Sequence, residues 1–268
     1  MVAAGPGNAA RPRLQRSGIW LLKALLPFVT LGALWQATSH FFPPYLFPGL
    51  QLIVHDVGKI LVTWDLISAG LVTWGRMIVA VAASLVIGIP IGLAMGLSRG
   101  VDDFVRPIVK FIMGVPALNW VIIVVIWFGN VELRISFVLV MLCVPITVFC
   151  VYDGVRSIDR KLTDMVLSFG ATRLQHVRLL LWPYVKASAF TATKLNIGNA
   201  VRTVIVAELV GAPFGIGREL DLAKNVFDMP MVLAWTLIMV TMAFVMTFGI
   251  EQAEHMVLRW RGSSHGRD

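Results

Sequence analysis

Long apolar runs separated by short polar segments make up most of this sequence. Six of these runs are long enough to cross a bilayer, for which a helix needs roughly 20 apolar residues. The runs lie near residues 19–39, 68–97, 107–129, 134–152, 187–210 and 232–257. The pattern predicts an all-α, polytopic membrane protein with six transmembrane helices between tails at 1–18 and 258–268.

Composition agrees with this pattern. Of the 268 residues, 57% are hydrophobic and only 14% are charged, whereas about a quarter of the residues in a soluble domain are charged. One protein core cannot hold so many apolar side chains, so lipid must be the solvent for much of the chain. The net charge of +8 falls in short clusters between apolar runs and not in one stripe. This distribution argues against a nucleic-acid partner.

The first apolar run resembles a cleavable signal peptide only superficially. Its apolar stretch is too long, and it is followed by Phe41-Phe42-Pro43-Pro44, where small residues would mark a cleavage site. We therefore expect a retained helix. After the proline-aromatic stretch, residues 50–64 are predicted to form a short amphipathic helix at the outer interface.

Two cysteines, Cys143 and Cys150, lie seven residues apart in one apolar run and so share a helical face. Two buried thiols are the favoured interpretation, and a disulfide or metal pair is the alternative. Two ligands alone do not make a zinc site, so no metal site is predicted.

The distribution of Lys and Arg predicts the orientation of the helices. Sixteen of these residues lie in the two tails and in the connections between the second and third and the fourth and fifth runs. The opposite connections hold only Lys59, Arg134, Arg218 and Lys224. Because Lys and Arg are enriched on the cytoplasmic side, both termini and the loop at 153–186 are predicted to be cytoplasmic.

Small residues recur every four positions in the second run. They are Ala80, Ser84, Gly88, Gly92, Gly96 and Gly100. This spacing leaves one helix face with almost no side chain, so a neighbouring helix can approach its backbone. Close helix packing is favoured over a pore-lining role. Pro90 in the same run is expected to bend the helix.

The loop at 153–186 is predicted to form an amphipathic helical hairpin. Apolar residues recur at helical spacing through Phe169, and Gly170 suits a helix end in the left-handed conformation. A second helix then runs to Pro183. Such a hairpin can lie on lipid, pack on its own bundle or insert into a partner's groove. The glycine and proline at its turn and end disfavour a helix that lies on lipid. Docking on a partner and packing on its own bundle remain equal alternatives.

The same loop resembles the coupling motif of binding-protein-dependent ABC importer permeases. That motif has an acid and two small residues, then glycine, then an aliphatic residue, and ends in leucine-proline. The matching positions are Asp164, Met165, Val166, Gly170, Leu180, Trp182 and Pro183. The spacing agrees throughout, but Asp replaces Glu, Met-Val replaces Ala-Ala, and Trp182 replaces Leu.

Further segments are similar to the nitrate/sulfonate/taurine branch of that family. They are Gly88 through Arg99, Trp127-Phe128-Gly129, Gly154 through Asp159, Ala207-Glu208 and Gly215-Ile216-Gly217. The ordered set spans roughly residues 45–257 and is more specific than any single motif. The residues that differ from the coupling motif affect the choice of the ATPase partner more than the mechanism of coupling.

The resemblance implies a type I importer permease of the bacterial inner membrane that works as a pair of copies. Each copy would insert its 159–183 hairpin into one of two cytoplasmic ATPase subunits, which would bind ATP and Mg²⁺. An extracytoplasmic binding protein would deliver the solute, and the branch imports nitrate, sulfonates, taurine, aromatic acids and vitamin precursors. The sequence itself supports a separate ATPase, because the chain has no G-x-x-x-x-G-K-[ST] phosphate loop.

Three basic residues fall inside or near the boundaries of the apolar runs. Arg76 and Lys194 are near helix ends and are expected to extend towards the membrane surface. Arg202 lies nearer the middle of its run, where charge usually faces a cavity or a partner. Arg202 and, more loosely, Glu208 are therefore candidates for the substrate pathway. A salt bridge from Arg202 to another helix is an equal alternative, and Glu208 lies on a different face.

Two other functional classes predict different features. An ion-coupled secondary transporter predicts acids near the midplane on broken, repeated helices, and the runs show no such acids. A membrane-embedded enzyme predicts clustered His or Asp within the runs. The histidines are His40, His55, His176, His255 and His265, all in loops or near helix ends. An importer permease that is not itself an enzyme is the preferred interpretation.

Overall fold

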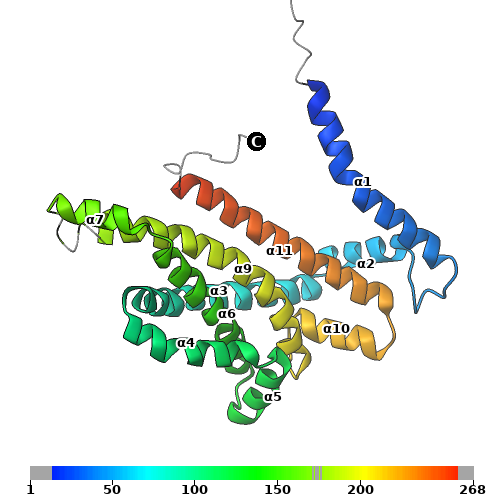
Figure 1. The fold of residues 1–268 in the computed structure, drawn as a ribbon. Helices are drawn as coiled ribbons and strands as arrows, with labels where there is room; N and C mark the ends of the chain where they lie inside the picture. The colour runs from blue at the N-terminus through cyan, green and yellow to red at the C-terminus, as the bar shows by residue number, and fades with distance from the viewer. Residues whose placement is uncertain (1–13, 171, 173–174, 176, 259–268) are drawn as a thin grey trace, which may run out of the picture.

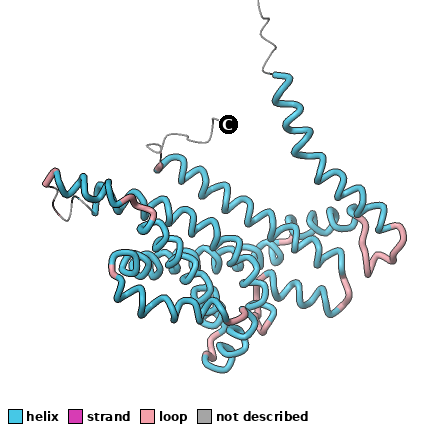
Figure 2. The backbone as a smooth tube through the Cα atoms, in the orientation of Figure 1, coloured by secondary structure: helices cyan, strands magenta, loops and turns pink. Residues whose placement is uncertain are grey.

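The computed structural model describes residues 14–170, 172, 175 and 177–258. The described residues form helices and their connections, without a β-strand (Figures 1 and 2). The elements are α1 (Leu14–Ser39), α2 (Leu50–Val62), α3 (Trp64–Leu97), α4 (Arg99–Gly114), α5 (Ala117–Trp127), α6 (Val131–Arg156), α7 (Arg160–Ser168), η1 (Val177–Leu181), α9 (Trp182–Leu209), α10 (Ile216–Asn225) and α11 (Met229–Val257). The all-α prediction and the short helix after residue 50 are confirmed.

Among the described residues, α3, α6 and α11 are each long and apolar enough to cross a membrane. The third apolar run, predicted at 107–129, is not one straight helix. It is divided between α4 and α5, which meet at an angle of 95°. Pro116 caps α5 at this break, and it lacks the amide hydrogen that would continue the hydrogen bonding of α4. The pair would count as a fourth span, and the six-helix count stays a prediction.

Three long helices, α3, α6 and α9, form the centre of the bundle. The main core joins them through fully buried side chains such as Met77, Leu139 and Val204. Helix α11 packs on α9 and α2, and α10 packs on both α9 and α11. Figure 1 shows α7 projecting at one end of the bundle and α10 near the opposite end, while α1 stands apart and contacts α2. The α10 end of the bundle is therefore packed against neighbouring helices, whereas the α7 end projects from the bundle.

The stripe of small residues on α3 faces α6. A β-carbon added at Gly88 would lie 2.6 Å from Cβ of Thr147, and one at Gly92 would lie 2.5 Å from the carbonyl oxygen of Val148. At Gly96 the nearest atom would be Cγ1 of Val155, at 2.7 Å. Real carbon contacts are longer than these distances, so the α3–α6 seam requires glycine. No atom lies within 4 Å at Gly100, which is outside the seam.

Ser84 is the polar member of the stripe and takes part in a link between the three central helices. The amide nitrogen of Asn196 on α9 donates to Ser84 Oγ at 3.0 Å and to Thr147 Oγ1 on α6 at 2.9 Å. All three side chains are fully buried. Polar links of this kind suit helices in lipid, where apolar packing gives little preference for one partner over another.

Candidate functional site

The predicted coupling segment forms the projecting end of the bundle. Helix α7 ends at Ser168, and the chain returns through η1 into α9, where Pro183 occupies the first turn. Gly170 has φ +74°, in the left-handed region. Only glycine adopts this conformation at little cost, which explains the residue at the turn. Ala171, Arg173, Leu174 and His176 lie outside the described residues.

The hairpin presents apolar side chains to its surroundings. Met165 is 50% exposed and Phe169 is 85% exposed, four residues further along the chain. Asp164 is exposed beside them, and Val166 is half-buried. An exposed apolar patch on a segment that projects from a bundle is typical of a partner contact.

Of the remaining three motif residues, Trp182 is 49% exposed, and the other two have a different position. Leu180 is buried, and Pro183 is half-buried at the start of α9. Leu181 belongs to a small core with Val151, Val155 and Val185, which joins α6 to α9. Leu180 and the adjacent Leu181 therefore anchor the hairpin to the bundle, while Asp164 and Met165 lie on its exposed surface. Phe169, which lies outside the motif, is more exposed than Met165.

Arg202 is exposed on α9. Its Nε donates to the carbonyl oxygen of Gly198 at 3.0 Å, so the side chain turns back along its own helix towards the η1 end. Leu209, the last residue of α9, lies seven residues further on, or about 10 Å along the axis. The guanidinium therefore does not extend to the nearer helix end. Glu208 has other partners, from α3 and from the start of α10.

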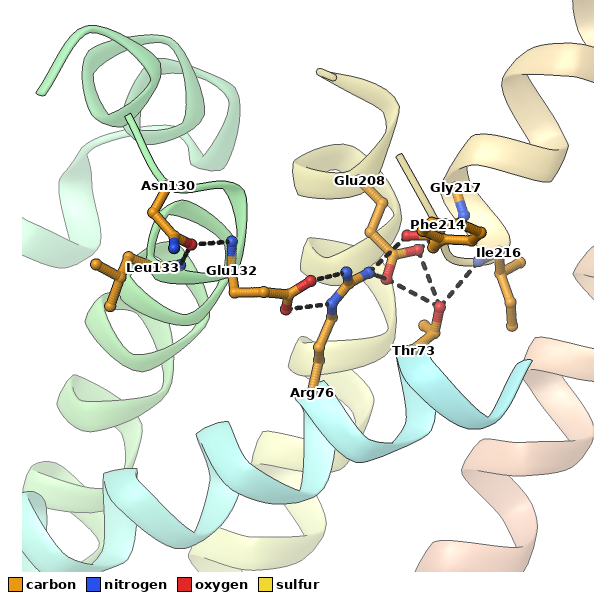
Figure 3. Close-up of polar contacts among 9 residues, drawn as sticks. All are labelled: Thr73, Arg76, Asn130, Glu132, Leu133, Glu208, Phe214, Ile216 and Gly217. Carbon is orange, nitrogen blue, oxygen red and sulfur yellow. Dashed lines mark hydrogen bonds and ion pairs between the residues drawn. The ribbon is translucent and has the colours of Figure 1, made fainter. Parts of the chain in front are cut away.

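Glu208 lies in a closed polar network near the α10 end of the bundle (Figure 3). The residue is 1% exposed. Its carboxylate accepts hydrogen bonds from Arg76 Nη1 at 2.6 Å, from the amide of Gly217 at 2.8 Å and from the hydroxyl of Thr73. The Thr73 oxygen in turn accepts from the amide of Ile216 at 2.9 Å. These donors compensate for the loss of water around a buried charge.

Arg76 occupies the centre of the network. In Figure 3 its guanidinium lies between the carboxylates of Glu132 and Glu208. Nε donates to Glu132 Oε2 at 2.9 Å, Nη2 forms an ion pair with the same carboxylate, and Nη1 also reaches the carbonyl oxygen of Phe214 at 2.9 Å. One side chain of α3 thereby ties the start of α6, the end of α9 and the loop before α10 together.

Two glycines allow the loop before α10 to close over Glu208. Gly215 has φ +126°, and a β-carbon there would lie 2.6 Å from the Glu208 carboxylate. A β-carbon at Gly217 would lie 3.0 Å from the carbonyl oxygen of Ile205. The Gly215-Ile216-Gly217 segment is therefore needed at this close approach, which gives that sequence motif a structural role.

The structure corrects two predictions. Arg76 does not extend to the membrane surface but is buried between two carboxylates. Glu208 does not line an open pathway, since its side chain is enclosed within a single chain. Pairing across helices explains both, because a partner removes the cost that drives charges out of lipid. Lys194 pairs with Glu254 at 2.7 Å, in the last turn of α11, and its extension towards the membrane surface stays a prediction.

Sequence reasoning missed Thr73 and Glu132 as members of this network. Thr73 and Arg76 are three residues apart, which places them on one face of α3. That spacing was the available signal. The partners come from α6, α9 and the loop before α10, so only the tertiary structure brings them together.

Comparison with known proteins identifies the family. Residues 84–254 match the family described as the binding-protein-dependent transport system inner membrane component. The chain belongs to this family. The matched region includes the seam, the hairpin and the Glu208 network except for Thr73 and Arg76. The protein is thus a permease of an ABC importer. Its helices include the predicted apolar helices that are long enough to cross a membrane.

Curated relatives of the permease are also transport proteins. The taurine transport permease of Escherichia coli is 28% identical over 200 residues, which are 74% of this chain and 71% of the relative. The formylaminopyrimidine transport permease of Halalkalibacterium halodurans is 27% identical over 245 residues, covering 90% and 96%. The riboflavin transport permease of Chloroflexus aurantiacus is 24% identical, covering 96% and 98%.

The fold is similar to a solved transporter. A chain of the inward-facing MetNI methionine ABC transporter aligns with a TM-score of 0.66 at 18% sequence identity. The alignment covers 72% of the permease and 96% of the solved chain. At this low sequence identity, the structural similarity shows a shared fold and nothing more. The shared fold is the predicted type I importer fold.

Proposed function

We propose that two copies of the permease form the membrane part of the importer, and that each docks its 159–183 hairpin on a separate cytoplasmic ATPase subunit. The supporting observation is the exposed apolar surface of Met165 and Phe169 on the projecting end of the bundle. The loop at 153–186 also lies among the positive charges that predict the cytoplasmic side. ATP and Mg²⁺ would bind to the ATPase subunits, since the permease has no phosphate-binding loop.

The solute that this account favours is small and anionic or polar, and an extracytoplasmic binding protein delivers it. Arg202 supports this choice, because its exposed guanidinium lies on a helix of the bundle centre and has a single backbone acceptor within its own helix. In a pair of copies, two such residues facing a shared path would favour anions. The relatives named for taurine and formylaminopyrimidine carry small polar compounds.

Reconstitution in liposomes tests the proposal. Purified permease, its ATPase subunit and its binding protein are combined, and uptake of the binding protein's ligand is measured with Mg-ATP. Uptake that requires the ATPase subunit and persists after a protonophore is the expected result. Uptake by the permease without that subunit, abolished by the protonophore, would contradict the proposal and support an ion-coupled secondary transporter.

Substitution of Arg202 tests the pathway assignment in the same assay. Arg202→Met should lower uptake of an anionic ligand, while Arg202→Lys, which keeps the charge, should retain most of it. The matched control is Arg134→Met on α6, whose guanidinium donates to a backbone carbonyl five residues away. Uptake by Arg202→Met at the wild-type rate, with unchanged selectivity, would refute the pathway role.

A further inference from the structure

A second polar cluster lies where α4 packs against the last turns of α6. Arg106 donates to both carboxylate oxygens of Asp102 through Nε at 2.9 Å and Nη2 at 2.8 Å, within α4. Tyr152 of α6 donates its hydroxyl hydrogen to Asp102 Oδ2 at 3.2 Å. Arg156, the last residue of α6, donates through Nε to the same hydroxyl at 3.3 Å.

The ring of Tyr152 strengthens this connection. The guanidinium of Arg106 lies over the ring, with its central carbon 4.6 Å from the ring centroid, and that of Arg156 lies 5.7 Å from it. Tyr152 therefore links the two helices through polar contacts, because its hydroxyl and its ring each contact α4 on one side and Arg156 on the other.

The cluster lies beside an apolar contact between the same helices. Met95, Val109 and Val148 form a small buried core that joins α3, α4 and α6. Asp102 is 7% exposed, so its carboxylate is enclosed at the edge of this core. Apolar surfaces resist separation but are non-directional, whereas hydrogen bonds and bidentate pairs fix one register. The cluster adds this directional component.

The chain path connects the cluster to the hairpin. Helix α6 ends at Arg156, and α7 begins at Arg160. The short connection is held by hydrogen bonds from the amide of Ser157 to the carbonyl of Asp153 and from that of Ile158 to the carbonyl of Val155. A displacement of α7 therefore reaches the last turn of α6 without a flexible linker between them.

We propose that Tyr152 is a positioning residue that transmits displacement of the hairpin from the end of α6 to α4, and through α4 to the bent α4–α5 pair. The proposal rests on the proposed coupling function. The Arg106 guanidinium is engaged by Asp102 and the tyrosine ring, and that of Arg156 by the tyrosine hydroxyl and ring. These contacts disfavour the use of this basic cluster to bind an anionic lipid headgroup. Tyr152 would act by keeping α4 in register with α6 as the hairpin moves.

Distance measurements between spin labels test the proposal in the assembled complex. After replacement of Cys143 and Cys150 by alanine, labels are placed at Lys110 on α4 or at Lys161 on α7, both of which are exposed. Each label pairs with its equivalent in the second copy. Distances are recorded in nanodiscs for the complex with its ATPase subunits, without nucleotide and after trapping with Mg-ATP and vanadate.

In the wild-type complex, both the Lys110 pair and the Lys161 pair should change distance on trapping. In Tyr152→Leu, the Lys161 pair should change as in wild type, whereas the change at the Lys110 pair should be lost. Tyr152→Phe keeps the ring and removes the hydroxyl bridge, so its Lys110 change should be smaller than in wild type. The resting distances should not differ between variants, which separates lost transmission from misfolding.

The outcomes that overturn the proposal are distinct from failure of the coupling function. A wild-type change at the Lys110 pair in Tyr152→Leu would overturn the transmission role. A full change in Tyr152→Phe would overturn the role of the hydroxyl. If the wild-type Lys161 pair does not move on trapping, the coupling function itself is refuted. Arg134→Met, at the opposite end of α6, is the control and should leave both changes intact.

Discussion

At the α10 end of the permease, the Glu208 carboxylate is enclosed by donors from α3 and from the loop before α10. At the α7 end, Met165 and Phe169 extend into the surroundings, and they have no comparable contacts among the residues that the structure describes. Both ends are polar interruptions of an apolar chain. The first is satisfied by its own chain, and the second has surface left for another protein.

The difference separates two uses of polar sequence in a membrane protein. A network that satisfies its own hydrogen bonds fixes how helices and loops are placed, and removal of one member leaves an uncompensated buried charge. A projecting hairpin contributes little to the stability of the bundle, so its sequence is free to suit a partner. Substitutions at the α10 end should therefore lower stability, while substitutions at the α7 end should lower assembly.

The largest expected effect comes from Glu208→Ala. This change leaves the buried guanidinium of Arg76 without its enclosed partner, so the free energy of unfolding should fall by about 3–5 kcal/mol. The control is Glu132→Ala, which removes the partner whose side chain is 60% exposed and should cost about 1 kcal/mol or less. Unfolding of the purified permease in mixed detergent micelles measures both. Equal losses would show that burial does not distinguish the two carboxylates.

A smaller effect is expected at the α3–α6 seam. Gly92→Ala places a methyl group against the backbone of α6, which cannot move aside as a side chain can, so stability should fall by about 1–3 kcal/mol. Gly75→Ala on the same helix has no atom within 4 Å of the added carbon and should be neutral or stabilising. The same unfolding experiment measures both variants. A loss of stability in Gly75→Ala as large as in Gly92→Ala would argue against a specific seam.

The smallest effect on stability is expected at the hairpin. The double variant Met165→Asp, Phe169→Asp changes two exposed side chains, so the free energy of unfolding should stay within about 0.5 kcal/mol of wild type. ATPase activity of the assembled complex should nevertheless be lost, because the apolar contact surface is removed. Wild-type ATPase activity in this variant would show that the partner binds elsewhere.

The sequence predicted the helical architecture and the sites of close packing better than it predicted the partners of charged residues. Long apolar runs located α3, α6 and α11, and the four-residue spacing of small residues indicated the face of α3 that approaches α6. Both signals are local, because a helix repeats its pattern along one segment. The break at Pro116 was missed, although proline is its local cause, because the apolar run continues through it.

The charge network was not predictable in the same way. Arg76 and Lys194 look like surface-seeking residues within their own helices, and their carboxylate partners lie 56 or more positions away in sequence. A single sequence does not indicate which distant residues meet. Within the hairpin, spacing identified the segment, but burial separated the anchoring residue Leu180 from the exposed Met165.

Co-purification of the ATPase subunit with Gly170→Pro tests the central claim, that the hairpin at 159–183 couples the permease to a separate ATPase, most directly. Proline cannot adopt φ +74°, so the turn should be disrupted while the bundle stays folded in the membrane. Tagged wild-type permease should retain the ATPase subunit, and an equal amount of inserted Gly170→Pro permease should not. Retention of active ATPase by Gly170→Pro at the wild-type level would contradict it.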